Sequence, residues 1–160
     1  FRRFLDRGIL VYGSFIFGSD HATPDTIKRT VEFAVDAKVF LANISPLTPT
    51  PGSRLYQRLQ REGRLLYDRW WLDPGYSYGD ITYRPSRFTP DELRDCCRHA
   101  REAFYGYGSI ARRLSNVTVN ARTPSHLGLF LSANVISRRE IAAKLGRRLG
   151  APDEPRYLPA

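Results

Sequence analysis

Residues 8–20 read GILVYGSFIFGSD, and residues 40–53 read FLANISPLTPTPGS. Each is a short apolar run that ends in small residues or prolines, which is typical of a buried β-strand followed by a loop. Between them, Thr23 and Pro24 predict a helix start, and an apolar stripe at helical spacing continues to Lys38. Strand, helix and strand in this order predict a β-α-β unit whose parallel strands are covered on both faces.

Ligands of parallel sheets bind at the carboxyl ends of the strands, so residues 18–23 and 47–53 are the predicted site loops. Asn43 and Ser45 occupy alternate positions of the second strand and therefore point to the same side. Facing inward, they would contact a ligand. Facing the covering helices, they would be polar groups satisfied inside the core.

The rest of the chain predicts mainly helices. Ser53 begins a helix that Gly63 ends, and residues 67–88 are an aromatic segment without a sustained period, expected to form an ordered loop or short hairpin. Thr89 and Glu92 have the spacing of a capping box. The helices expected beyond it cover about residues 90–105, 109–115 and 125–149, and the segment from Ala151 is expected to be disordered.

Five stretches occur in a familiar order. They are residues 13–20, Thr23 with Pro24, the loop PLTPTPG at 46–52, Leu55 with Tyr56, and residues 62–65. Together they resemble the C-terminal part of cobalamin-binding radical S-adenosylmethionine (SAM) enzymes, over roughly residues 4–114. In that family the stretches correspond to the fifth and sixth strands of a partial (β/α) barrel and the loop and helix that follow. The resemblance implies that residues 1–68 end the barrel and that residues 69–160 are an aromatic loop with a helical extension.

The family carries a Gly-x-Ile-x-Gly-x-x-acid pattern against the adenosine. Ile16 and Gly18 keep their places here, whereas Ser14 replaces the first glycine and His21 the acid, for which Asp20 could substitute. Alternatively, Ile16 and Gly18 only end a buried strand. No catalytic or metal-binding residue is expected in this chain. The cofactor-binding residues that the resemblance implies are Ser14, Ile16, Gly18, Asp20, Asn43 and Ser45.

The chain has no methionine and opens within an amphipathic helix, so we expect it to continue an upstream part of the same protein. The resemblance implies that the full-length protein uses SAM, a [4Fe–4S] cluster and cobalamin, and that this chain alone binds neither cluster nor cobalamin and is inactive. The only cysteines, Cys96 and Cys97, are adjacent, a spacing that suits ordinary helix residues, one of them buried. Their scarcity fits a reducing cytoplasm.

The formal charge of +9 is concentrated near the C-terminal end, in Arg112, Arg113, Arg138, Arg139 and residues 144–148. The interpretation that fits the resemblance is a solvated helix face in an enzyme that methylates or rearranges a small molecule, such as a lipid, tetrapyrrole or natural-product precursor. Two alternatives stay open. They are an RNA-binding region of an RNA-modifying radical SAM enzyme and a non-catalytic α/β interaction module. No run approaches the ~20 apolar residues of a membrane span.

Overall fold

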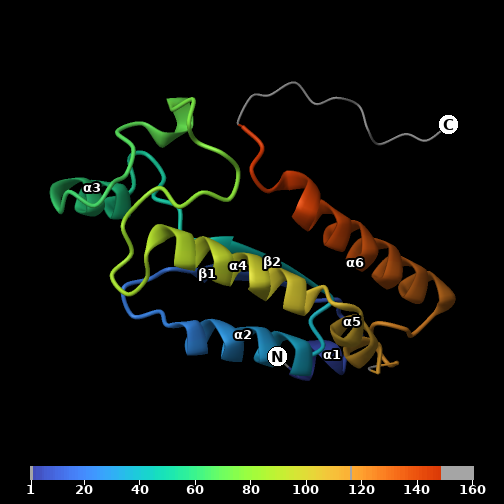
Figure 1. Cartoon of the computed structure of the whole chain (residues 1–160). Coiled ribbons are helices and arrows are strands. Elements are labelled where there is room, and N and C mark those ends of the chain that lie inside the picture. The colour runs from blue at the N-terminus through green and yellow to red at the C-terminus, as the bar shows by residue number, and fades with distance from the viewer. Residues whose placement is uncertain (1, 116, 149–160) are drawn as a thin grey trace, which may run out of the picture.

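The computed structural model describes residues 2–115 and 117–148. Its elements are helix α1 (Arg2–Leu5), strand β1 (Tyr12–Phe17), helix α2 (Pro24–Asp36), strand β2 (Leu41–Pro46), helix α3 (Arg54–Arg61), a 3-10 turn (Trp70–Leu72), and helices α4 (Pro90–Phe104), α5 (Tyr107–Leu114) and α6 (Pro124–Lys144). The predicted α/β class, with two parallel strands followed by a mainly helical segment, is confirmed (Figure 1).

The β-α-β unit forms as its local sequence dictates. Strands β1 and β2 pair in parallel, with Tyr12 opposite Leu41 at one end. Helix α2 makes the crossover, and a reciprocal pair of hydrogen bonds between Thr23 and Thr26 caps its first turn. Pro24 suits the first helical position because that residue needs no hydrogen-bond donor.

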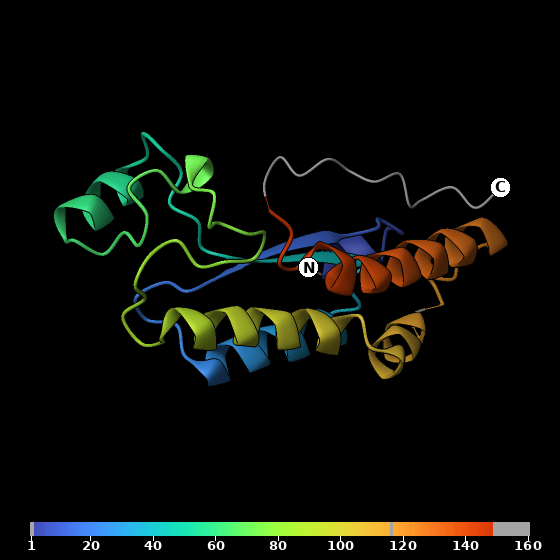
Figure 2. The ribbon, with the colours of Figure 1, turned by 45° about the horizontal axis from the view of Figure 1, so that its top comes forward.

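Figure 2 shows α2 and α4 together on one side of the sheet. Their apolar stripes and the inward side chains of the strands form the main core, which includes the fully buried Val39 and Leu93. On the other side of the sheet, Tyr12 and Ile16 are 64% and 62% exposed. The expectation that both faces are covered is therefore wrong for the described residues, because both covering helices pack on the same face.

The fully buried side chain of Arg113, in α5, joins α5 and α6 to α4 and to the residues just before β2. Its guanidinium donates to the carbonyl oxygens of Val39, Phe40 and Phe104 at 3.0–3.1 Å and to Asn134 Oδ1 at 2.8 Å. It also lies 3.9 Å from the centre of the Phe104 ring. Burial lowers the pKa of Arg113 to about 10, so the group is still charged at neutral pH. Neutral acceptors on three segments thus surround one buried cation.

Helix α4 begins where the sequence predicts it. Thr89 and Glu92 form the expected capping box, and the backbone N–H of Thr89 donates to Glu92. This hydrogen bond lowers the pKa of the Glu92 carboxyl. The preceding segment is held by an antiparallel bridge between Leu65 and Tyr83, so the aromatic stretch is an ordered loop with a single 3-10 turn.

Helix α6 differs from its prediction in two ways. It ends at Lys144 and not near residue 149, because Gly146 turns the chain with a φ of +78°. The apolar composition of residues 127–136 predicts that this part of the helix is a packing face, and this prediction is wrong. Apolar side chains lie all round this part of the helix, and only Phe130 and Asn134 are buried in it. The segment from Ala151 lies outside the described residues.

Candidate functional site

Four of the predicted site residues share one face of the sheet. Ser14 and Ile16 of β1 and Asn43 and Ser45 of β2 alternate with the residues that enter the core, and the register pairs Ser14 with Asn43 and Ile16 with Ser45. We call the face that carries them, together with Tyr12, the open face. Ser14 and Asn43 are exposed there and Ser45 is half-buried, so these polar groups are not enclosed in the core of the described residues. Their contact with a cofactor stays a prediction.

The open face combines a flat apolar surface with short polar groups. Ile16 and Tyr12 present the apolar part, and the hydroxyl and amide groups beside them can each make hydrogen bonds. This composition is typical of small-molecule sites, in which apolar walls supply affinity and a few polar groups fix orientation. The open face therefore has the chemistry to hold one side of an adenosine-sized ligand.

One edge of β1 has no strand partner among the described residues. Beside it, a groove of about 380 Å³ lies between β1 and α2, and its lining includes Ser14, Ile16, His21 and Thr30. An exposed strand edge offers backbone N–H and C=O groups in a row and readily pairs with another strand. The edge and the groove are thus suited to receive a further strand of a larger sheet.

Gly18 does not lie on the open face but is buried behind it. Its carbonyl oxygen accepts a hydrogen bond from the hydroxyl of Tyr83, and a β-carbon at this position would lie 2.6 Å from Leu93 Cδ2 and also collide with the Tyr83 hydroxyl. Its φ of +106° is a further reason for glycine. The close approach that requires glycine is therefore an approach to Tyr83 and Leu93, and a role as a cofactor contact gains no support from it.

Asp20 is engaged in an ionic network. Its carboxylate accepts hydrogen bonds from Arg64 at 3.0 Å, Arg58 at 2.9 Å and the hydroxyl of Ser86 at 2.7 Å. The hydrogen bonds from Ser86 and Arg64 lower the pKa of Asp20. The carboxylate thus ties the loop after β1 to α3 and to the segment before α4. Sequence spacing could not reveal this, because the three partners lie 38 to 66 residues away.

Aromatic side chains gather beyond the carboxyl ends of the strands. Trp70 packs edge-on against Trp71 and tilted against Tyr76, with ring centres 5.8 and 5.0 Å apart, and Tyr56 packs on Trp71. The indole N–H of Trp70 donates to the carbonyl oxygen of Pro49, 3.1 Å away. The aromatic loop is thereby anchored to the proline-rich loop that follows β2.

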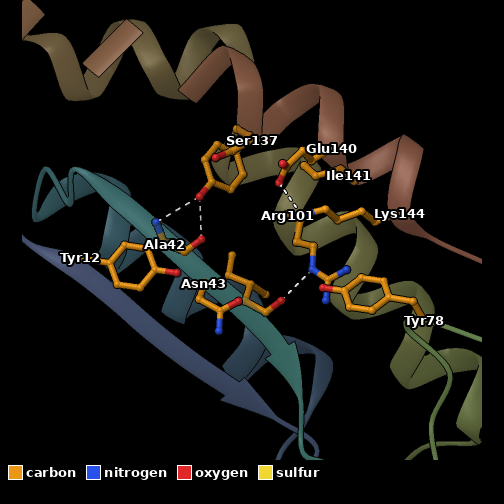
Figure 3. Close-up of a pocket in the computed structure, with 11 residues that line it drawn as sticks. Tyr12, Ala42, Asn43, Tyr78, Arg101, Ser137, Glu140, Ile141 and Lys144 are labelled. Atoms are coloured by element: carbon orange, nitrogen blue, oxygen red, sulfur yellow. Dashed lines mark hydrogen bonds and ion pairs between the residues drawn. The ribbon is translucent and has the colours of Figure 1, made fainter. Parts of the chain in front are cut away.

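A second hollow, the edge pocket, lies at the edge of β2 that faces away from β1 (Figure 3). It has a volume of about 250 Å³ between β2, α4, α6 and Tyr78, and it adjoins the open face through Tyr12 and Asn43. The hydroxyl of Tyr105 accepts from the N–H of Ala42 and donates to its C=O, at 3.2 and 2.6 Å. This side chain therefore satisfies both backbone groups of Ala42 at the strand edge.

Neither cysteine is placed to bind a metal. Cys97 is buried, which raises the pKa of its thiol to about 11, and Cys96 is half-buried with a raised pKa. The expectation that one of the two is a buried helix residue is confirmed. Within residues 2–115 and 117–148, no three His, Cys, Asp or Glu side chains come together as a metal site would require. The described residues therefore do not fit an iron–sulfur cluster.

Comparison with known proteins finds two partial relatives. The chain is 29% identical over 98 residues to an uncharacterized methyltransferase of Pyrococcus horikoshii, a match that covers 61% of this chain and 21% of that protein. It is 39% identical over 61 residues to the hopanoid C-2 methylase of Rhodopseudomonas palustris, covering 38% of this chain and 12% of the methylase. No protein-family profile and no solved structure matches. The chain thus spans about a fifth or less of the curated relatives it matches, and both relatives are named for methyl transfer.

Proposed function

We propose that residues 1–68 form the end of the barrel of a cobalamin-binding radical SAM methylating enzyme, and that the residues from 69 onward are its aromatic loop and helical extension. The observation that carries the proposal is the open face, a parallel-sheet surface with exposed apolar and polar side chains next to an unpaired strand edge. The partial likeness to a methyltransferase and a methylase supports methyl transfer as the reaction class.

In this proposal, the open face is one wall of the SAM cavity. Ile16 gives the adenine ring an apolar surface, and Ser14, Asn43 and Ser45 offer hydrogen bonds to the ribose or the substrate. Gly18 and Asp20 act behind this wall by fixing the loop after β1. The wall excludes water on its side, which radical chemistry requires so that the reactive carbon meets the substrate and not the solvent.

Upstream residues hold the cluster and cobalamin in this proposal, since the described residues offer no group of ligands for a cluster. When bound, the cluster would supply the electron and cobalamin the methyl-carrying centre of the reaction. The unpaired edge of β1 is the place where the upstream part of the sheet would join this chain. The substrate would be a lipid, tetrapyrrole or natural-product precursor.

Anaerobic turnover of the full-length protein tests the proposal. The protein is reconstituted with iron, sulfide and cobalamin, incubated with SAM, and the products are separated by chromatography with and without a strong reductant. We expect cleavage of SAM that depends on both the reductant and the cluster. Release of S-adenosylhomocysteine with no reductant present would contradict the radical class and leave ordinary methyl transfer.

Three arginines of the basic C-terminal end give the RNA-binding alternative little support. Arg112 forms an ion pair with Asp36 at 2.7 Å, Arg113 is fully buried, and Arg138 lies 4.5 Å from the centre of the Tyr107 ring. These contacts lie within the fold. No helix of the described residues is long and apolar enough to cross a membrane.

A further inference from the structure

The edge pocket carries a chemical preference of its own, which starts at Arg101. This arginine reaches from α4 toward the edge of β2, where its Nε donates to the carbonyl oxygen of Ile44 at 2.7 Å (Figure 3). That hydrogen bond fixes the orientation of the planar guanidinium. No side chain or carbonyl of the described residues forms a hydrogen bond or ion pair with its two terminal nitrogens, so this end of the fork can receive a ligand.

The charge of the pocket is positive. Its lining contains two cations, Arg101 and Lys144, and one carboxylate, Glu140. Lys144 Nζ lies 2.9 Å from Glu140, so this carboxylate is balanced by its own partner. The guanidinium of Arg101 therefore gives the pocket its net positive charge. A cationic ligand would find no unpaired carboxylate in the lining and would be repelled by Arg101.

The neutral groups of the lining are donors suited to anionic oxygens. Tyr12 and Tyr78 each present a hydroxyl, and Asn43 presents an amide. Tyr78 is 44% exposed and Tyr12 is 64% exposed, so both can adjust to a ligand. An arginine with two free terminal nitrogens binds a carboxylate or phosphate through two parallel hydrogen bonds, the geometry in which such contacts are strongest.

We infer that the edge pocket is a binding subsite for a carboxylate or phosphate group, with Arg101 as its principal ligand. The volume of about 250 Å³ suits such a group and a few neighbouring atoms but not a whole drug-sized molecule. Because the pocket adjoins the open face through Tyr12 and Asn43, the anion would be one end of a molecule whose remainder lies over the sheet. The placement of the rest of the molecule over the sheet rests on the proposed function, and it specifies that the substrate of the proposed enzyme is an anion.

Chemical protection of the full-length protein tests the subsite without any variant. Phenylglyoxal modifies accessible arginines, and mass spectrometry of the digested protein gives the rate at each one. The probes are inorganic phosphate and, in a separate arm, acetate, each at about 10 mM with ionic strength matched by chloride. For a Kd of about 1 mM, typical of one charged contact with supporting donors, the modification of Arg101 should slow about tenfold.

Arg98 is the matched control. It lies on the same helix, is paired with Glu102 at 3.1 Å and Asp95 at 3.5 Å, and does not line the pocket. The rate at which phenylglyoxal modifies Arg98 should be the same with and without either anion. Protection in only one arm identifies the preferred anion. Equal protection of both arginines, or protection of neither by either anion, would overturn the inference.

Calorimetric titration with inorganic phosphate gives a second readout. Arg101→Gln should weaken binding at least tenfold and Arg98→Gln less than twofold, because only the first removes a charge-assisted contact. If Arg101→Gln does not fold, the protection rates of the unmodified sequence decide the question. Neither experiment uses SAM or turnover, so a failure of the subsite and a failure of the proposed enzyme class give different results.

Discussion

Replacing Gly18 with alanine should destabilise the fold by an amount that the structure lets us divide into two parts. The first part is backbone strain, because a φ of +106° is unfavourable for any residue with a β-carbon and costs about 1–3 kcal/mol. The second part is overpacking. The new methyl group would lie 2.6 Å from Leu93 Cδ2 and would also meet the Tyr83 hydroxyl, and both side chains are almost fully buried.

Forcing a methyl group into a packed site costs about 1–3 kcal/mol, so we expect the two parts to add to about 2–6 kcal/mol. Gly52→Ala is the matched control, because Gly52 has a φ of +81° and a β-carbon added there would meet no atom within 4 Å. Gly52→Ala should lower the free energy of unfolding only by the backbone strain, about 1–2 kcal/mol. Tyr83→Phe alone should cost about 1 kcal/mol, because it removes one buried hydrogen bond.

Native-state hydrogen exchange of amides in β1 and α4 measures these differences, since it reports the opening of this unit whatever else the protein contains. Combining Gly18→Ala with Tyr83→Phe should cost less than the sum of the two, by about 1 kcal/mol, because phenylalanine lacks the hydroxyl with which the new methyl group collides. A cost for Gly18→Ala no greater than that for Gly52→Ala would refute the packing role and return Gly18 to the candidate ligand contacts.

Three further results are expected. Asp20→Asn should lower the free energy of unfolding by about 1–2 kcal/mol at pH 7. The pKa of Asp20 is lower in the folded than in the unfolded protein, so the stabilisation by its carboxylate is complete above the unfolded-state pKa and is lost as the pH falls through the folded-state pKa. The unfolding free energies of the Asp20→Asn variant and the unmodified protein, measured with urea, should therefore converge between about pH 5 and 2. Arg113→Met should lower the free energy of urea unfolding by about 2–4 kcal/mol, because it leaves the backbone carbonyl oxygen of Val39 and the side-chain Oδ1 of Asn134 without a donor; a neutral effect would show that removing the buried charge compensates. Iodoacetamide at pH 8 should label Cys97 only under denaturing conditions, because its thiol is buried with a pKa of about 11; fast labelling of the native protein would contradict this burial.

The local features of the fold were predictable because their causes are local. Thr23 and Thr89 start their helices through contacts with residues three positions on, and the apolar runs of β1 and β2 identify strands without any knowledge of their partners. Residue alternation likewise placed Asn43 and Ser45 on one side of β2, although it could not say which side faces the helices.

The contacts that the sequence could not predict join distant segments. Gly18 meets Tyr83 across 65 residues, and Arg113 meets Val39 across 74. The packing face of α6 was mispredicted because its apolar residues surround the helix and give no stripe. Arg101 occupies a position that sequence alone would assign to a solvated helix surface, and only the approach of β2 and α6 makes it part of a pocket.

Calorimetric titration of the reconstituted full-length protein with SAM measures whether the open face is a wall of the SAM cavity. Ile16→Lys puts an ammonium group on the open face, where the native side chain is 62% exposed and so can be replaced without disturbing the core. Phe33→Lys is the control, because Phe33 is 54% exposed on α2, the helix that covers the opposite face. We predict that Ile16→Lys weakens SAM binding at least tenfold, since a charge in an apolar contact must be desolvated, and that Phe33→Lys leaves the affinity unchanged. Equal affinities for both variants and the unmodified protein would contradict this role of the open face.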